Sequence, residues 1–226
     1  MDKHRGAIRA AFWTILVLGS ALLGAGGAAL DLDRSTKRIV VVGWFFLIVL
    51  AAVAIDLLWY RELGKKVEAL RPLLTENPDH YIREIRALLE GKRSPHLRGV
   101  LLVNLSAAYQ EKGDYKTAAN LLRSVNPKKL AGMNRSIYWA DLALAYFHLG
   151  ENARALEILA AQEPGFSKLR ESAALGGLLA ILSVFQMLAL GNRAGAKQRL
   201  EQARPLWEEA RNARKFEALA QRCQEI

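Results

Sequence analysis

The chain has few of the residue types that build covalent or metal-held frameworks. It contains one cysteine, Cys223, so no disulfide can form within the chain, and this suits a reducing compartment. Its four histidines, His4, His80, His96 and His148, show no metal-ligand spacing with one another or with Cys223. These absences argue against a disulfide-stapled fold and against a metal site.

Signatures of catalysis are also lacking. No glycine-rich phosphate loop follows a strand-like segment, and no nucleophile lies beside a plausible base. His148 lies seven residues from Asp141, one heptad along a helix, and a surface pair is the simpler interpretation of that spacing. The sequence therefore predicts a protein that is not an enzyme, with no catalytic, cofactor-binding or metal-ligating residues and no cofactor.

Long runs of one charge are absent as well, although the formal net charge is +10. No basic run exceeds two residues, and residues 61–226 carry 26 Lys and Arg against 18 Asp and Glu. Such a surplus favours acidic partners or anionic lipid headgroups. Nucleic-acid binding would rest on charge alone, densest at Lys128 and Lys129, so nucleic acid is not predicted as a partner.

Apolar residues, in contrast, form two long runs near the N-terminus. Residues 10–30 carry no charge, and residues 39–60 carry one, Asp56. About 20 apolar residues at a rise of about 1.5 Å cover a bilayer core of about 30 Å, so both runs qualify as transmembrane helices. The loop between them, residues 31–38, is polar apart from one leucine. The sequence therefore predicts a transmembrane helical hairpin.

Two features of this hairpin have alternative interpretations. The first run could instead be a cleaved signal peptide, because a basic start precedes it and small residues end it. Asp56 could mark an ion path, but it lies four residues from Tyr60, within reach of the interface, and a structural role is preferred. A stripe of small residues, Ser20, Gly24 and Ala28, is expected to pack the two spans together.

Lysine and arginine counts predict the orientation. The segments 1–9 and 61–71 carry seven of these residues, and the loop 31–38 carries three. Positive flanks stay in the cytoplasm, so both termini and the rest of the chain are predicted to be cytoplasmic. The composition, rich in Ala, Gly and Arg, points to a bacterial cytoplasmic membrane.

The remainder of the chain shows helical periodicity and an internal repeat. Residues 61–94 are expected to form connecting helices, with start signals at Asn77 and Ser94 and a stop at Gly91. The stretch NLSAAYQEKGDYKTAANLLRSV, residues 104–125, returns 37 residues later as DLALAYFHLGENARALEILAAQ. In each copy a glycine, Gly113 or Gly150, supplies a left-handed turn between two antiparallel helices. A weaker third copy is centred on Gly191.

These residues resemble the tetratricopeptide repeat (TPR), a helix-turn-helix unit of about 34 residues. The first two copies match its pattern at the following positions: Leu105, Tyr109, Gly113, Asp114, Tyr115, Ala118 and Leu122, then Trp139, Leu142, Tyr146, Gly150, Ala155 and Leu159. The third keeps only its second half, because Ser183 replaces the leucine and Met187 replaces the tyrosine of the pattern, and the spacings of 37 and 41 are long. The resemblance covers residues 95–205, in units of about 95–130, 134–166 and 172–204.

The resemblance implies an α-solenoid whose concave groove, lined by the first helix of each unit, binds a peptide or a partner's helix. By position, the partner-binding residues are Asn104, Ala107, Gln110, Glu111, Ala140, Asp141, Leu144, Phe147, His148, Ile181 and Phe185. Val103 and Asp141 stand where the family's carboxylate-binding members have lysine and asparagine, so a carboxylate clamp is not expected.

One segment has a competing interpretation. Residues 173–190 carry no charge and are at the length threshold for a third membrane span, or they form the first helix of the third repeat. After them, residues 206–226 are expected to form a capping helix with these side chains mostly inward: Leu206, Trp207, Ala210, Phe216, Leu219 and Cys223.

Together, the sequence predicts an all-α, membrane-anchored TPR-like scaffold that binds a protein partner at the cytoplasmic face. The alternative is a regulatory or structural subunit of a membrane transport or secretion complex, in which the transmembrane hairpin is the functional part. Loss of transport on substituting Asp56 would favour that alternative.

Overall fold

The computed structural model describes residues 2–29, 33–91, 93–207 and 210–225, and these ranges contain helices and no strand. The predicted all-α class is therefore confirmed. The chain divides into two compact units, Met1–Glu68 and Ala69–Ile226. The side chains of Gly24, Ala28 and Asp56, on which parts of the membrane prediction depend, lie outside the described residues.

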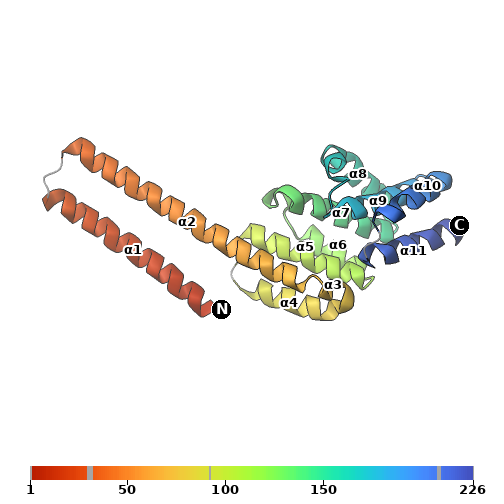
Figure 1. The fold of residues 1–226 in the computed structure, drawn as a ribbon, viewed down its shortest axis with the longest axis horizontal. Coiled ribbons are helices and arrows are strands. Elements are labelled where there is room, and N and C mark those ends of the chain that lie inside the picture. The colour runs from red at the N-terminus through yellow and green to blue at the C-terminus, as the bar shows by residue number, and fades with distance from the viewer. Residues whose placement is uncertain (1, 30–32, 92, 208–209, 226) are drawn as a thin grey trace. The chain divides into compact units, whose positions relative to one another are not determined.

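The first unit contains two antiparallel helices (Figure 1). They are α1 (Asp2–Ala29) and the part of α2 (Arg34–Leu70) that precedes Ala69. The carboxylate of Asp33 begins α2, because it accepts hydrogen bonds from the backbone amides of Ser35 at 2.9 Å and Thr36 at 3.2 Å. The helix therefore takes in residues 34–38, which the sequence had assigned to the loop. It also continues past residue 60 to Leu70 without a break.

The Trp44 side chain of α2 reaches across to α1. A Cβ added at Gly19 would lie 2.3 Å from Cζ2 of the Trp44 ring, so only glycine fits there. The indole Nε1 of Trp44 donates to Ser20 Oγ at 3.2 Å. Ser20 therefore lies at the helix contact that its small-residue stripe predicted.

Among the described residues, α2 is the one helix long and apolar enough to cross a bilayer. Its large apolar side chains face outward; Phe45 is 68% exposed and Phe46 is 63% exposed. The apolar segment of α1 that is described, Ala11–Leu23, is shorter than a span. The first transmembrane helix accordingly stays a prediction.

The second unit is a continuous series of helices. Their bounds are α3 (Leu73–Glu76), α4 (Pro78–Glu90), α5 (Pro95–Glu111), α6 (Tyr115–Arg123), η1 (Pro127–Lys129), α7 (Gly132–His148), α8 (Asn152–Phe166), η2 (Ser167–Leu169), α9 (Gly176–Ala189), α10 (Arg193–Ala203), η3 (Arg204–Leu206) and α11 (Ala210–Glu225). The predicted starts at Asn77 and Ser94 are confirmed, because both side chains cap helices through backbone amides, those of His80 at 3.0 Å and Leu97 at 3.3 Å.

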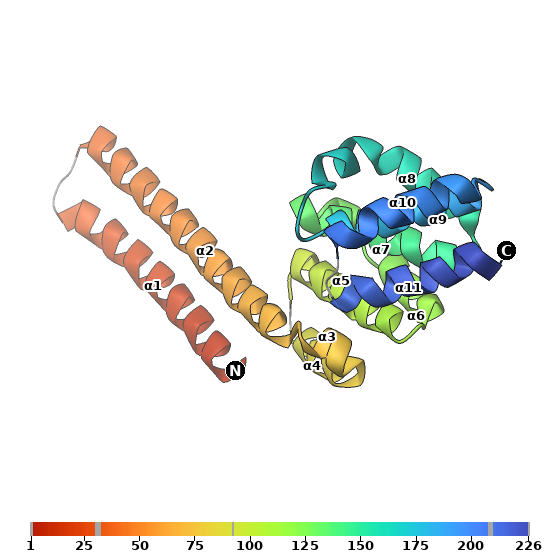
Figure 2. The same ribbon diagram turned by 45° about the vertical axis from the view of Figure 1, so that its right-hand side comes forward.

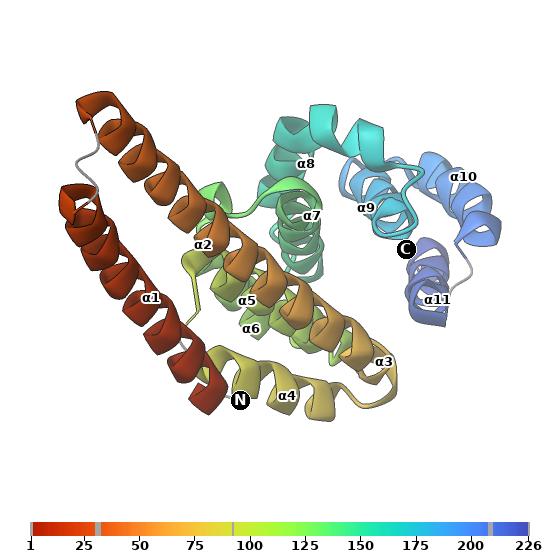
Figure 3. The same ribbon diagram turned by 60° about the vertical axis from the view of Figure 1, so that its left-hand side comes forward.

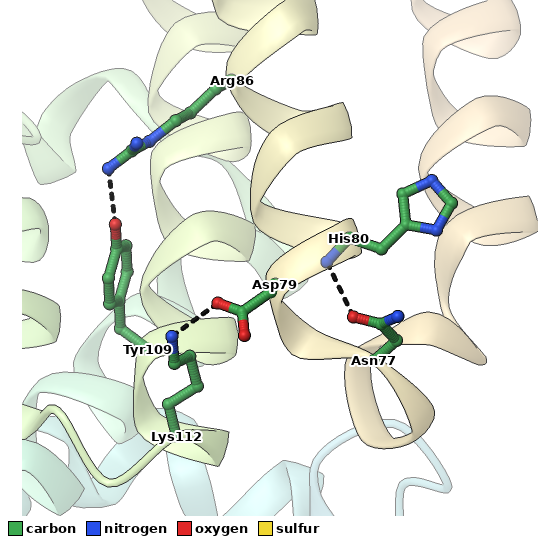
Figure 4. Close-up of polar contacts among 6 residues, drawn as sticks. All are labelled: Asn77, Asp79, His80, Arg86, Tyr109 and Lys112. Carbon is green, nitrogen blue, oxygen red and sulfur yellow. Dashed lines mark hydrogen bonds and ion pairs between the residues drawn. The ribbon is translucent and has the colours of Figure 1, made fainter.

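Helix α4 packs along α5 and covers one of its sides. Polar contacts hold the two together: Lys112 Nζ lies 2.5 Å from Asp79 Oδ1, and Arg86 Nη2 donates to Tyr109 OH at 2.5 Å (Figure 4). Asn77 lies at the turn that starts α4 (Figure 4). These contacts hold α4 against α5, the first helix of the hairpin series.

Residues 95–203 form three helical hairpins, α5–α6, α7–α8 and α9–α10, and the helices of each hairpin pack against each other. Each turn has the same left-handed glycine, with φ of +77° at Gly113, +76° at Gly150 and +74° at Gly191. The amide three residues beyond the last helical residue bonds back in the same way each time; Asp114 N donates to Tyr109 O at 2.9 Å in the first turn. The predicted glycine turns are therefore confirmed.

Small side chains lie where the helices of a hairpin meet. Ala118, Ala155 and Ala196 occupy equivalent positions in α6, α8 and α10, and all three are fully buried. A methyl group at each crossing allows the helix backbones to approach closely. The hairpins then stack in sequence, with α5 against α7 and α7 against α9.

Two expectations for the end of the chain are resolved. Helix α9 has 14 residues, and Ile181, Leu182 and Val184 are buried in the core, so the described segment is a core helix shorter than a span. The capping helix α11 begins at Ala210, later than predicted. Leu206 was wrongly expected to face inward: it lies in the 3₁₀ turn η3 and is 74% exposed, because α11 has not yet begun.

Candidate protein-binding site

The first helices of the three hairpins carry a connected group of side chains. We call this group the inner face, and it consists of Glu111 on α5, Tyr115 at the start of α6, Phe147 and His148 on α7, and Phe185 on α9. Figure 3 shows the hairpins following one another in an arc, with α11 after the last of them. The inner face therefore joins residues from all three hairpins.

Aromatic contacts connect the hairpins across the inner face. The Tyr115 and His148 rings stack with centroids 3.7 Å apart, and the Phe147 and Phe185 rings stack at 5.4 Å. His148 also meets Phe185 edge to face at 5.0 Å. Such pairs add about 0.5–1.5 kcal/mol each beyond the area that they bury. His148 is thus the residue through which all three hairpins meet.

Helix α11 packs against α9 and α10 and reaches the inner face (Figure 2). Lys215 Nζ lies 2.7 Å from Glu111 Oε1, and the two side chains are only 18% and 11% exposed. The Arg222 guanidinium lies 5.6 Å from the centroid of the Phe185 ring. Between these two cations, Phe216 and Leu219 are buried. A basic, amphipathic helix of the chain itself therefore covers the inner face.

The charges of α11 act on His148. Burial, together with the positive charges of Arg222 and Lys215, lowers the pKa of His148 to about 4. The imidazole is therefore neutral at physiological pH. Burial also raises the pKa of Tyr115, with the Glu111 carboxylate acting in the same direction.

A buried polar link joins α5 to α7 beside the inner face. Gln110 is 2% exposed, and its Nε2 donates to the backbone oxygen of Asp141 at 3.1 Å. Its other side-chain atom, Oε1, is buried without a hydrogen-bond partner among the described residues. This link holds the register of the first two hairpins.

The structure places the sequence-predicted groove residues in three environments. Glu111, Phe147, His148 and Phe185 belong to the inner face. The others, apart from Asn104, are buried between helices, so they do not line an open surface: Ala107, Gln110, Ala140, Asp141, Leu144 and Ile181. In this conformation, neighbouring helices cover these six side chains. Their role in partner binding stays a prediction.

Asn104 contacts α4, although the sequence had placed it in the partner-binding groove. Its Oδ1 accepts a hydrogen bond from Tyr81 OH at 3.2 Å, and its Nδ2 donates to the Val100 oxygen at 2.9 Å. Tyr81 is on α4, so Asn104 belongs to the contact between α4 and α5. It forms no part of the inner face.

Sequence reasoning missed three residues of the site: Tyr115, Lys215 and Arg222. A signal for the last two exists, because Lys215, Phe216, Leu219 and Arg222 are spaced to share one side of a helix. Their acidic and aromatic partners lie on other hairpins, and only the tertiary structure identifies them.

Within the described residues, no group of three or more His, Cys, Asp and Glu side chains is placed to hold a metal ion. The inner face offers one carboxylate, a neutral imidazole and aromatic surface, which fit a basic and apolar ligand. Comparison with known proteins gives no match to this chain among family models, curated proteins or solved structures.

Proposed function

We propose that the chain is a membrane-anchored protein-binding module that holds an amphipathic helix of a partner protein against the inner face. One observation carries this proposal: the chain's own α11 packs there with its cations on Glu111 and Phe185 and with Phe216 and Leu219 buried. A surface that accepts one basic amphipathic helix has the shape and charge to accept another.

The architecture supports a relationship with the tetratricopeptide repeat. The hairpins repeat the same left-handed glycine turn, and their first helices pack in order, α5 to α7 to α9. In that family the first helices form the binding face. The repeat spacing of 37 and 41 residues remains longer than the family's about 34.

The exposed apolar surface of α2 supports anchoring in a membrane. An anchored module meets its partner at a raised local concentration, so a modest intrinsic affinity is sufficient. The excess of Lys and Arg in segments 1–9 and 61–71 favours a binding module on the cytoplasmic side.

Site-specific photocrosslinking in cells tests this function with the full chain. A photoreactive phenylalanine replaces His148 on the inner face, and in a control it replaces Glu157, an exposed residue of α8. We expect a protein adduct of defined mass from position 148 and none from position 157. Equal adducts from both positions, or none from either, would contradict the proposal.

A further inference from the structure

We propose that α11 is a built-in competitor for the inner face, and that the partner is a basic amphipathic helix which displaces it. This inference rests on the proposed function and deepens it. In this arrangement the site is closed in the free protein, and the partner opens it by presenting the same chemistry as α11.

The contacts of α11 differ from the other ion pairs of the second unit. The Lys215–Glu111 pair is 18% and 11% exposed, whereas Lys112–Asp79 is 39% and 65% exposed and Arg170–Glu163 is 48% and 54% exposed. Charges withdrawn from water attract each other more strongly than exposed charges. The pair therefore selects a lysine or arginine at this point of any helix that binds here.

The composition of α11 allows it to leave without unfolding the hairpins. Among its described side chains, Phe216 and Leu219 are buried, Ala220 and Cys223 pack partly buried against the core, and the opposite side is exposed and polar, including Glu217 and Gln221. Helix α9 contributes more buried side chains to the same core cluster: Leu179, Ile181, Leu182, Val184 and Phe185. Elements with few buried apolar contacts open first, so α11 is the element suited to exchange.

The partner's chemistry follows from what α11 presents. Lys215, Phe216, Leu219 and Arg222 occupy relative positions 0, 1, 4 and 7 on one side of the helix. A competing helix needs a base opposite Glu111, an aromatic and an aliphatic residue at the buried positions, and a cation over the Phe185 ring. The opposite side of the competing helix, where α11 carries glutamate and glutamine, does not contribute to binding.

The experiment measures binding of a helix supplied in trans. The probe is a fluorescent peptide with the sequence of residues 210–225, carrying Cys223→Ser, and the receptor is the full chain in a non-ionic detergent. Fluorescence anisotropy gives the affinity, and a scrambled peptide of the same charge measures non-specific binding. Because α11 is tethered, its effective concentration is about millimolar, so the peptide competes poorly against the wild-type chain.

Two receptor variants change the fraction of time that α11 occupies the inner face, one lowering it and the other raising it. K215A/R222A removes both of its cations and leaves the inner face intact, so the site opens. G177C/N212C, made with C223S, locks α11 to α9 by a disulfide. A Cβ at Gly177 lies 3.1 Å from Asn212 Cγ, close to the separation of about 3 Å between a Cβ and the distant sulfur in a disulfide. The single variants G177C and N212C are the matched controls.

We expect the peptide to bind K215A/R222A at least tenfold more tightly than the wild type. The oxidised lock should not bind it, and reduction should restore the wild-type affinity. Glu111→Gln in the open variant should weaken binding by several fold, because the peptide's lysine then loses its partner. Far-ultraviolet circular dichroism checks that every variant keeps its helices.

The remaining outcomes separate the inference from the function beneath it. Equal affinity for open, wild-type and locked chains, still sensitive to Glu111→Gln, overturns the competition by α11 and leaves the helix-binding function standing. No binding to any form overturns both. Light scattering measures the oligomeric state of K215A/R222A. If this variant is a dimer, the inference is also overturned, because α11 of a second copy then occupies the inner face.

Discussion

At the scale of single residues, the array depends on a few positions that no other side chain can fill equally well. Gly113, Gly150 and Gly191 hold the left-handed conformation that reverses the chain. His148 holds the aromatic contacts between hairpins, and it does so as a neutral ring. Two predictions belong to this scale.

The first concerns the turn at Gly113, where φ is +77°. Replacing it with alanine introduces a Cβ into a left-handed conformation, and we expect a loss of about 1–2 kcal/mol in unfolding free energy. The matched control is Gly165→Ala in α8, where a Cβ meets nothing within 4 Å. That change should be neutral or stabilising by up to about 1 kcal/mol. Denaturant unfolding monitored by circular dichroism distinguishes the two, and equal effects would contradict the assignment.

The second concerns the pH dependence that His148 creates. Its pKa is about 4 in the folded chain and about 6.5 when unfolded. Between these values the unfolded chain binds the extra proton, so stability falls as the pH drops from about 6.5 toward 4 and is unaffected by His148 above that window. Melting temperatures at pH 7.5 and pH 5 should therefore differ less in His148→Phe than in the wild type. The control His80→Gln, at a half-exposed histidine of α4, should keep the wild-type difference.

At the scale of elements, α11 is distinguished by how little holds it. Its attachment consists of a polar pair with Glu111, a cation over Phe185 and a narrow apolar stripe. The hairpins supply most of the core cluster, from α5 to α10, and α11 adds only Phe216 and Leu219 as fully buried members among its described side chains. The element that covers the candidate site is therefore less firmly held than the elements that form it.

Removing the Lys215 side chain tests this attachment. Lys215→Ala removes the ion pair of the nearly buried Glu111 carboxylate, and we expect a loss of about 1–3 kcal/mol. Arg170→Ala removes a half-exposed partner of Glu163 and should change stability by less than about 0.5 kcal/mol. Hydrogen exchange should show the lost protection in α11 before α7 or α9. Loss of protection spread evenly over the hairpins would mean that α11 is an integral part of the core.

At the scale of the whole molecule, the two units have different surfaces. The described side chains of α2 in the first unit expose large apolar groups, and the second unit buries its own in a single core. Among the described residues, α2 is long and apolar enough to cross a bilayer. Placing α9 in the core removes the need for a span between the second and third hairpins.

Reporter fusions test the resulting topology. We expect fusions after Arg170 and after Ile226 to be active on the same, cytoplasmic side, because the described α9 is a 14-residue core helix. A fluorescent protein that matures only in the cytoplasm and a phosphatase active only outside it give opposite readouts at each site. Opposite sides for the two fusions would mean that residues 173–190 cross the membrane.

Local features of this fold follow from the sequence because local interactions cause them. Asn77, Ser94 and Asp114 begin helices by accepting a hydrogen bond from the amide three residues ahead, and glycine is favoured where φ is positive. The three hairpins could therefore be predicted to within a few residues. The loop before α2 was misjudged because the cap at Asp33 decides that boundary.

The candidate site depends on contacts that the sequence alone does not reveal. Glu111 and Lys215 are 104 residues apart, and whether they meet depends on how far each hairpin turns relative to the last. Resemblance to a repeat family predicted a face on the first helices, but not the burial of Ala140, Leu144 and Ile181. Helix starts and turns were determined by the sequence through interactions within a few residues. The covering of the inner face by α11 was decided by tertiary packing, since small rotations at each hairpin add up along the array.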